Sequence, residues 1–581
     1  MLRTVASTIR RTARDRFGWR TLRPGQAEAV RALVKGSDVL VVMPTGSGKS
    51  AVYQLAGLLL DGPTVVVSPL IALQRDQLAG LAARGGGKPG LEAVAVNSAQ
   101  GAQQTTHAWE SLRTGTAEFI FLAPEQLAND AVVDRLAAAG VSLFAVDEAH
   151  CVTAWGHDFR PDYLRIGDVM ERLGSPRIVA LTATAAPPVR AEIIEKLKMR
   201  RPVQIIQGFD RPNLRLEVDR FTDGRRKQAA VVAKVEELTG SGLIYTATRK
   251  DTEQYAEMLR ASGRRAAAYH AGMKAADRER VHTGFLADEI DVVVATSAFG
   301  MGIDKPNVRF VVHADISESL DSYYQEIGRA GRDGDPALAL LCYRSEDLGL
   351  RNFFASGGGD PEVLTTVAGA VRRHTKTEGA VDPSVLKDEL KLSHTRLTNA
   401  INLLEQAGAV DVDGQGRLHY TDPKLAVDTA VTQATEVAEA YVRVDRSRIE
   451  MMRGYAETTG CRRQFLLGYF GEALPDLCGN CDTCASGSAA GYLNGLPEAL
   501  PARARTARGW TARGRRAGKR TAVKPAFAVN AQVEHRAWGR GVVMRHEPDR
   551  ITVLFDQVGY RTLALVALQA DDGLLVVQEP A

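Results

Sequence analysis

The chain has 581 residues, of which 45% are apolar and 24% are charged, a composition typical of ordinary soluble globular proteins. This length is enough for about three to five domains. No apolar run approaches the roughly 18 residues that a membrane span requires, which argues against a membrane protein. An apolar signal-peptide core is also absent, so the expected compartment is the cytoplasm.

The N-terminus, MLRTVASTIRRTARDRFGW, is rich in arginine and poor in acidic residues. A transit peptide has this composition, but residues with a predicted function begin directly afterwards, at Trp19. An amphipathic first helix is therefore the preferred interpretation.

Residues 39–50, VLVVMPTGSGKS, read as a buried strand, a tight turn and the start of a helix. This arrangement directs backbone N–H groups and the positive end of a helix at a phosphate. The usual P-loop pattern begins with glycine, where this chain has Met43. A solvated Gly/Ser turn is the alternative, which the flanking strand and helix disfavour. The predicted phosphate-binding residues are Thr45, Gly46, Ser47, Gly48, Lys49 and Ser50, with Lys49 on the β- and γ-phosphates and Ser50 on Mg²⁺.

A second motif follows the apolar strand in residues 141–150, VSLFAVDEAH. Acidic residues at the end of a strand beside a phosphate loop are suited to holding Mg²⁺ and activating water. We therefore expect Asp147 to face the metal and Glu148 to face the attacking water. A solvated acidic turn is the alternative.

Short β-branched runs alternate with helical stretches up to about residue 345, which predicts two successive α/β lobes with parallel sheets. GFDRPNL, residues 208–214, has the turn chemistry of a connector between them. The predicted strands of the first lobe are VLVVM, TVVVSP, EAVAV, FIFLAP, LFAVDE and RIVALTAT, and those of the second are SGLIYTATR, RAAAYHAG, IDVVVATS, VRFVVH and LALLCY.

Beyond residue 360 the pattern becomes helical. Ser393 is a candidate helix cap, and Leu397, Ile401 and Leu404 share one helical face. AVDVDGQGRLHYT then reads as a hairpin around an Asp-Gly turn. Residues 361–421 thus follow a winged-helix pattern, and a further helical stretch covers about 427–459.

Four of the six cysteines, Cys461, Cys478, Cys481 and Cys484, lie within 24 residues. In a chain without a secretory signal this spacing favours a metal over disulfides, and four thiolates suit tetrahedral Zn²⁺. A closed four-ligand site has a structural role. The other two, Cys151 and Cys342, are expected to be ordinary buried thiols.

Residues 501–525 contain seven Arg and two Lys and no acid, although the net charge of the chain is only +4. We interpret 486–525 as a disordered basic linker that binds phosphates regardless of sequence, with a merely solvated linker as the alternative.

Residues 527–571 alternate in strand fashion and predict a small β-barrel. Its Trp-Gly-x-Gly-x-Val pattern resembles the Tudor-like domain of some bacterial superfamily 1 helicases, which implies a docking module for a protein or nucleic acid; a simple stabilising barrel is the alternative.

Together, TGSGKS, DEAH, LTATA at 181–185 and QEIGRAGRDG at 325–334 resemble a superfamily 2 helicase. FGWRTLRPGQAEAV at 17–30, DEAHCVTAWGHDFRPDY at 147–163 and FGMGIDKPNVRFVVH at 299–313 narrow the resemblance to the RecQ family of DNA helicases. It extends over residues 1–355 and resumes at 441–484, where the cysteine spacing is similar to that of the RecQ zinc-binding subdomain.

This resemblance implies that Trp19 stacks on adenine while Arg23 and Gln26 bind its edge, so ATP is the expected nucleotide. Arg329 and Arg332 are expected to reach the γ-phosphate from the second lobe, with Arg332 favoured as the arginine finger. The implied fold is two RecA-like lobes followed by smaller modules. The predicted divisions are 1–207 and 208–355 for the lobes, 361–421 for the winged helix, 427–485 for the zinc-binding subdomain, 486–525 for the linker and 527–571 for the barrel.

The resemblance also implies an aromatic-rich loop in which Trp155, Phe159 and Arg160 touch single-stranded DNA. The alternative is that one of the two aromatic residues, Trp155 or Phe159, belongs to the core. Here Thr153 and Ala154 stand where relatives often have Ser-Gln. RecQ proteins commonly carry their winged helix after the zinc cysteines, whereas this chain carries it before them. Strand separation and a spacer or protein-contact role are both open for this module.

The expected function is that of an ATP-dependent 3′→5′ DNA helicase that uses Mg²⁺ and Zn²⁺ and acts on single-stranded and forked DNA in repair and recombination. A monomer associated with the nucleoid is expected, with a protein partner for the barrel. The alternatives are an RNA-stimulated superfamily 2 helicase and a winged-helix DNA-binding regulator with a degenerate ATPase core.

Overall fold

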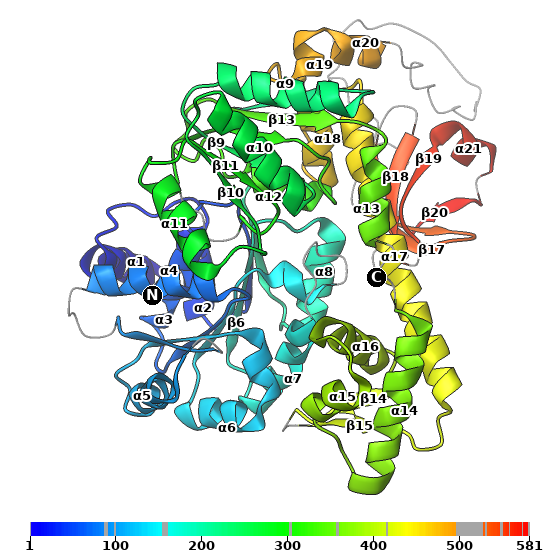
Figure 1. Ribbon diagram of the computed structural model, residues 1–581. Coiled ribbons are helices and arrows are strands. Elements are labelled where there is room, and N and C mark those ends of the chain that lie inside the picture. The colour runs from blue at the N-terminus through cyan, green and yellow to red at the C-terminus, as the bar shows by residue number, and fades with distance from the viewer. Residues whose placement is uncertain are drawn as a thin grey trace, which may run out of the picture. The chain divides into compact units, whose positions relative to one another are not determined.

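The structure is a computed structural model, shown in Figure 1. It describes residues 2–85, 91–97, 100–153, 161–300, 305–355, 359–413, 416–494, 527–528, 531–546, 550–556, 558–571 and 573–578. The chain divides into two compact units, Met1–Ala456 and Glu457–Ala581. Among the described residues, none of the helices is long and apolar enough to cross a membrane.

The first lobe is built on a seven-stranded parallel sheet with the order β3-β4-β2-β5-β6-β1-β7. Its strands are β1 Val39–Val42, β2 Thr64–Val67, β3 Ala93–Val96, β4 Phe119–Leu122, β5 Leu143–Val146, β6 Arg177–Thr182 and β7 Val203–Ile206. Its helices are α1 Leu2–Phe17, α2 Gln26–Val34, α3 Ser50–Gly57, α4 Ile71–Gly85, α5 Ala102–Arg113, α6 Asp130–Ala139, α7 Ile166–Arg172 and α8 Pro187–Lys196, with 3₁₀ turns η1 Pro124–Ala128, η2 Ala149–Val152 and η3 Pro161–Arg165. All six predicted strands are present.

The predicted N-terminal helix is also present as α1. Its Ile9, Ala13 and Phe17 repeat every fourth position, are at most 7% exposed, and join the core of the first lobe. A helix that contributes one face to the core is part of the lobe.

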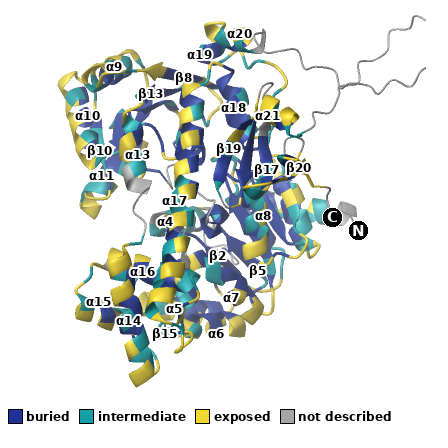
Figure 2. Ribbon diagram, turned by 90° about the vertical axis from the view of Figure 1, so that its right-hand side faces the viewer, coloured by how far each residue is buried: buried dark blue, intermediate teal, exposed yellow. Residues whose placement is uncertain are grey.

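The second lobe contains a six-stranded parallel sheet with the order β10-β11-β9-β12-β13-β8. Its strands are β8 Leu214–Arg220, β9 Ser241–Tyr245, β10 Ala266–Tyr269, β11 Val292–Ala295, β12 Val308–His313 and β13 Ala337–Tyr343, and its helices are α9 Gly224–Glu237, α10 Arg249–Ala261, α11 Ala275–Leu286, α12 Leu320–Ile327 and α13 Asp347–Ala355. In Figure 2 the strands of both lobes are mainly buried, whereas the helices also show exposed faces. The five predicted strands are present here too.

Two strands were not predicted, β7 and β8, and they flank the connector on either side. Each lies at the edge of its sheet. Residues of β8 alternate between buried and exposed, and β7 has only one fully buried position, Ile205. An edge strand buries less of its surface than a central one, so its sequence lacks the continuous apolar run that identified the others.

The winged-helix pattern is also observed. It consists of α14 Pro361–Glu378, α15 Pro383–Leu390, α16 His394–Gln406 and the antiparallel pair β14 Val410–Val412 and β15 Leu418–Tyr420. The Ser393 side chain caps α16 by accepting a hydrogen bond from the backbone N–H of Arg396. Leu397, Ile401 and Leu404 are buried in the core of this module, as their spacing predicted.

A 31-residue helix, α17 Val427–Glu457, joins this module to the second lobe. Near its start, Ala430 and Ala434 complete the winged-helix core. Near its end, the Tyr455 hydroxyl lies 3.2 Å from that of Tyr323 on α12. At 1.5 Å per residue the helix is about 46 Å long, so it acts as a strut between the two.

The second unit contains α18 Arg462–Tyr469, α19 Asp482–Ala485, α20 Ser488–Asn494, β16 Gln532–His535, β17 Gly539–His546, β18 Arg550–Phe555, β19 Gly559–Ala564, α21 Leu565–Ala570 and β20 Leu575–Val577. Its five strands form an antiparallel sheet in the order β19-β18-β17-β16-β20. Within the described residues the end strands β19 and β20 do not pair, so a closed barrel is not observed. The sheet also extends beyond the predicted boundary at 571, because β20 pairs with β16.

The predicted linker begins with ordered structure. Residues 488–494 form α20, in which Ala489 is fully buried and Tyr492 packs against Gly460. These apolar contacts explain why the chain stays helical past residue 486. The basic stretch 501–525 lies outside the described residues.

Candidate active site and metal centre

The phosphate loop connects β1 to α3. Gly46 and Gly48 have φ values of +78° and +80°, a region that glycine enters without steric cost. Met43 has no positive φ; it is 1% exposed and belongs to the core of the first lobe. Its carbonyl accepts a hydrogen bond of 3.2 Å from Nζ of Lys49. The loop therefore forms without a glycine at position 43.

The two predicted carboxylates follow β5 directly. Asp147 is 7% exposed, and Glu148 has a left-handed backbone, with φ +48° and ψ +49°, that is rare for a side chain of its size. Such strain is often found at functional positions. Burial raises the pKa of Asp147, and the nearby Glu148 raises it further.

Charge in this region is poorly solvated. Burial lowers the pKa of Lys49, while the carboxylates of Glu148 and Asp147 oppose that effect. The lowered pKa of Lys49 disfavours its positive charge, and the raised pKa of Asp147 disfavours its negative charge. A bound polyphosphate would compensate the first charge and Mg²⁺ the second. Oxygen donors such as Ser50 and Asp147 are those that Mg²⁺ prefers, so these residues fit the metal.

His150 links the carboxylates to the end of β6. Its Nδ1 lies 3.0 Å from Oγ1 of Thr182 and 3.4 Å from a carboxylate oxygen of Glu148. Oγ1 of Thr182 also donates to the carbonyl of Thr184. The predicted general base thus lies next to a buried polar chain that reaches the loop after β6.

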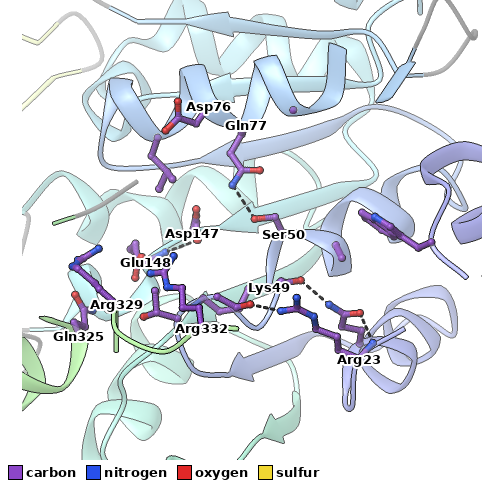
Figure 3. Close-up of a pocket in the computed structure, with 18 of the residues that line it drawn as sticks. Arg23, Lys49, Ser50, Asp76, Gln77, Asp147, Glu148, Gln325, Arg329 and Arg332 are labelled. Carbon is purple, nitrogen blue, oxygen red and sulfur yellow. Dashed lines mark hydrogen bonds between the residues drawn. The ribbon is translucent and has the colours of Figure 1, made fainter. Parts of the chain in front are cut away.

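Both lobes line a single cavity of about 610 Å³. Figure 3 shows Arg329, Arg332 and Gln325 of the second lobe on the same cavity as Lys49 and Ser50 of the first. Across this cleft, Nε2 of Gln325 lies 3.3 Å from Oγ1 of Thr184. The cavity is therefore complete only when the lobes are together.

The two arginines differ in position. A Cβ built on Gly46 would lie 3.1 Å from Cδ of Arg332, so Arg332 packs directly over the phosphate loop. The guanidinium of Arg329 instead lies beside Gly300 of its own lobe, 3.2 Å from a Cβ built there. This geometry favours Arg332 over Arg329 as the finger.

The predicted adenine residues also line the cavity. Nε2 of Gln26 donates to the carbonyls of Ser47 and Gly48, and Arg23 donates to that of Gly46. The ring of Trp19 stacks on Phe17 at a centroid distance of 4.4 Å and is only partly buried. Gln26 and Arg23 are therefore bound to the phosphate loop itself, a link that spacing alone did not predict.

The predicted DNA-contacting residues Trp155, Phe159 and Arg160 lie in 154–160, outside the described residues. Five residues after Arg160 in the sequence, Arg165 of η3 forms an ion pair with Glu405 of α16 through its guanidinium. The winged-helix module thus contacts the first lobe at η3.

Several residues of the cavity were not singled out from the sequence. Gln325 stands inside the QEIGRAGRDG motif, whose arginines alone were assigned a role. Asp76 and Gln77 of α4 line the cavity from a helix without a recognised motif. The only indication of them in the sequence is that these polar residues interrupt the apolar pattern of α4.

The four clustered cysteines lie in the second unit. Their Sγ atoms are all within 4.8 Å of one another, and those of Cys478 and Cys484 are 3.8 Å apart. Tetrahedral thiolates on Zn²⁺ would be separated by about 3.8 Å, given Zn–S bonds of about 2.3 Å, whereas a disulfide bond is about 2 Å long. Cys461 is the N-cap residue of α18. The cluster therefore fits Zn²⁺, and Cys151 and Cys342 are buried thiols as expected.

Three protein families match the chain. They are the DEAD/DEAH box helicase at residues 23–192, the helicase conserved C-terminal domain at 227–334 and the RecQ zinc-binding family at 425–485. The last match covers the four cysteines, which identifies the cluster as a Zn²⁺ site. The first two cover the cavity residues of the two lobes from Arg23 to Arg332, and an ATP-dependent helicase of this type uses ATP with Mg²⁺.

Individual relatives give the same result. The chain is 32% identical over 479 residues to the "Probable ATP-dependent DNA helicase RecS" of Bacillus subtilis (strain 168), covering 82% of this chain and 91% of that protein. It is 43% identical over 332 residues to the ATP-dependent DNA helicase RecQ of Haemophilus influenzae, covering 57% of this chain and 52% of the relative. The DUF1998 helicase MrfA, bound to DNA in its crystal structure, has a similar fold over 73% of this chain and 63% of its own, with 15% identity and a TM-score of 0.51. From these matches and the cavity shared by two parallel-sheet lobes, the chain belongs to the RecQ family of ATP-dependent DNA helicases in superfamily 2.

Proposed function

We propose that this DNA helicase moves 3′→5′ along single-stranded DNA and opens forked duplexes during repair and recombination. One chain supplies both walls of the nucleotide cavity, which supports a monomer as the working unit. We place the enzyme in the cytoplasm, associated with the nucleoid, because such DNA occurs there.

The observation that supports coupling of movement to ATP hydrolysis is the packing of Arg332 over Gly46 across the cleft. The 3′→5′ direction is inferred from the family alone. Hydrolysis then requires both lobes, so ATP binding favours closure and product release allows opening. Base–aromatic stacking is worth about 1–3 kcal/mol per base, and duplex stacking averages about 1.4 kcal/mol per step. Stacking can therefore offset melting at one step, but directional travel needs a cycle driven by hydrolysis.

The decisive experiment is strand displacement on duplexes with a single-stranded tail at the 3′ end, the 5′ end or both. We expect unwinding of the 3′-tailed and forked substrates with ATP and Mg²⁺, and none with a non-hydrolysable analogue. Preference for the 5′ tail would overturn the proposed polarity, and unwinding with the analogue would overturn the coupling to hydrolysis.

We also propose that Trp155, Phe159 and Arg160 touch single-stranded DNA. The Trp155→Ala variant should bind nucleotide normally but lose most DNA stimulation of its ATPase, because it loses a stacking surface worth about 1–3 kcal/mol. Turnover with and without a single-stranded oligonucleotide measures this. Undiminished stimulation would remove the loop from the mechanism.

An RNA-stimulated helicase is the principal rival, and the same turnover assay with RNA in place of DNA separates the two. A regulator with a degenerate ATPase core is disfavoured, because the charged residues of both lobes are retained around one cavity. Measurable turnover would exclude it.

The winged-helix module has two proposed roles, strand separation and spacing. Residues 361–421 carry seven Lys and Arg against eight Asp and Glu, so the module lacks the basic excess typical of duplex-binding domains. Its ion pair between Arg165 and Glu405 supports a role in bracing the first lobe.

For the C-terminal sheet we propose docking of a protein partner.

A further inference from the structure

A polar cluster of Gln77, Tyr53 and Gln54 lies beside the phosphate loop. Gln77 projects from α4 toward α3, and Figure 3 shows its side-chain amide directed at Ser50. Nε2 of Gln77 donates a hydrogen bond of 2.9 Å to Oγ of Ser50. The contact joins two helices that follow different strands, so it depends on packing and not on a local motif.

Two neighbours fix the orientation of the Gln77 amide. Its Oε1 accepts hydrogen bonds from the Tyr53 hydroxyl at 3.1 Å and from Nε2 of Gln54 at 3.4 Å. Tyr53 is fully buried and Gln54 is 2% exposed, so both donors are held by the core. Because both donors converge on Oε1, the NH₂ group of Gln77 is the end that faces Ser50.

The hydrogen bond constrains the Ser50 hydroxyl. A hydroxyl has two lone pairs and one proton, and the donated N–H of Gln77 occupies one lone pair. The second lone pair and the proton remain for the cavity, where Asp147 also lies. A metal ligand must present a lone pair, so this orientation suits a serine that binds a cation.

We propose that Gln77 is a positioning residue of the ATPase reaction, which holds the Ser50 hydroxyl in the orientation that receives the Mg²⁺ of Mg²⁺–ATP. This inference rests on the proposed role of Ser50 as a Mg²⁺ ligand. In this role Gln77 acts on the metal through Ser50 and is not itself a ligand. Tyr53 and Gln54 serve the same purpose one step further away, by fixing the amide.

The test is equilibrium binding of a fluorescent AMP-PNP derivative to the full chain, measured in EDTA and across a Mg²⁺ titration. In Gln77→Met, which keeps the side-chain length but not the hydrogen bonds, the gain in affinity from Mg²⁺ should fall roughly threefold to tenfold, the factor expected of one hydrogen bond. Binding in EDTA should stay unchanged, because the phosphate loop is intact. Equal weakening in EDTA would reveal a merely structural role and overturn the proposal.

A double-mutant cycle tests whether Gln77 acts through Ser50. In the Ser50→Ala background, Gln77→Met should cause no further loss of the Mg²⁺ effect, whereas an equal loss there would refute the proposal. Tyr53→Phe should reduce the gain in affinity from Mg²⁺ in the same way but less strongly, and it replaces Gln77→Met as the test if that variant does not fold. If Ser50→Ala alone leaves the Mg²⁺ dependence intact, the metal role of Ser50 fails and this inference with it. The polarity and DNA dependence of the helicase are measured separately by the tailed duplexes.

Discussion

Replacing Arg332 with alanine should lower DNA-stimulated ATP turnover by about 10³- to 10⁵-fold, the range seen when an inserted arginine is removed from other phosphoryl-transfer enzymes. This factor corresponds to about 4–7 kcal/mol of transition-state stabilisation. The physical reason is that Arg332 lies over Gly46 and brings a positive charge of the second lobe to the phosphate loop. Steady-state turnover with saturating single-stranded DNA measures the loss.

Nucleotide binding distinguishes this effect from misfolding. The Arg332→Ala variant should still bind a fluorescent ATP analogue, because the phosphate loop and Lys49 belong to the first lobe. Arg265→Ala is a matched control: this arginine also lies in the second lobe, is largely exposed, pairs with Asp291 and lies outside the cavity. It should keep nearly full turnover. If Arg332→Ala also keeps nearly full turnover, ATP is not hydrolysed between the two lobes.

Removing zinc should unfold the region around the four cysteines. Structural Zn²⁺ contributes about 10–16 kcal/mol in zinc-finger peptides, which is as large as the whole stability of a typical native protein, about 5–15 kcal/mol. Arg462 and Arg463 of α18 are 2% and 4% exposed, and Arg462 pairs with Asp482 at 2.8 Å. Trypsin should therefore cleave at these arginines only after chelation of the metal or in the Cys481→Ser variant.

Limited proteolysis followed by mass spectrometry, together with a zinc assay, checks this result. Cys342→Ala is the matched control, because Cys342 is a buried thiol of the second lobe, far from the cluster in the sequence. This variant should retain zinc and protection from trypsin. Protection that survives complete loss of zinc would show that the metal is not structural.

Local sequence predicted the parts of the site that are built from neighbouring residues. The stretch 39–50 specifies a strand, two glycines with positive φ and a helix start, so the phosphate loop could be read directly. The pair Asp147 and Glu148 at the end of β5 is equally local. The cysteine spacing indicated zinc because thiolate ligands at such short separations can converge on one ion.

Other features depended on context. The edge strands β7 and β8 escaped prediction because only part of each is buried. Burial of Ala489 extended helical structure into α20, within the stretch interpreted as linker. Similarly, Gln77 carries no motif, since its partner Ser50 lies on another helix and is brought near only by the tertiary fold.

The sequence by itself thus determined the chemistry: a phosphate loop, a pair of carboxylates, candidate arginines and four zinc thiolates, each encoded within a short stretch of chain. Only the tertiary structure decided which arginine packs over Gly46, which amide orients Ser50 and how α17 ties the winged-helix module to the second lobe. The reason is that these contacts join segments far apart in the chain. Their distances follow from the packing of whole sheets and helices, which no local pattern records.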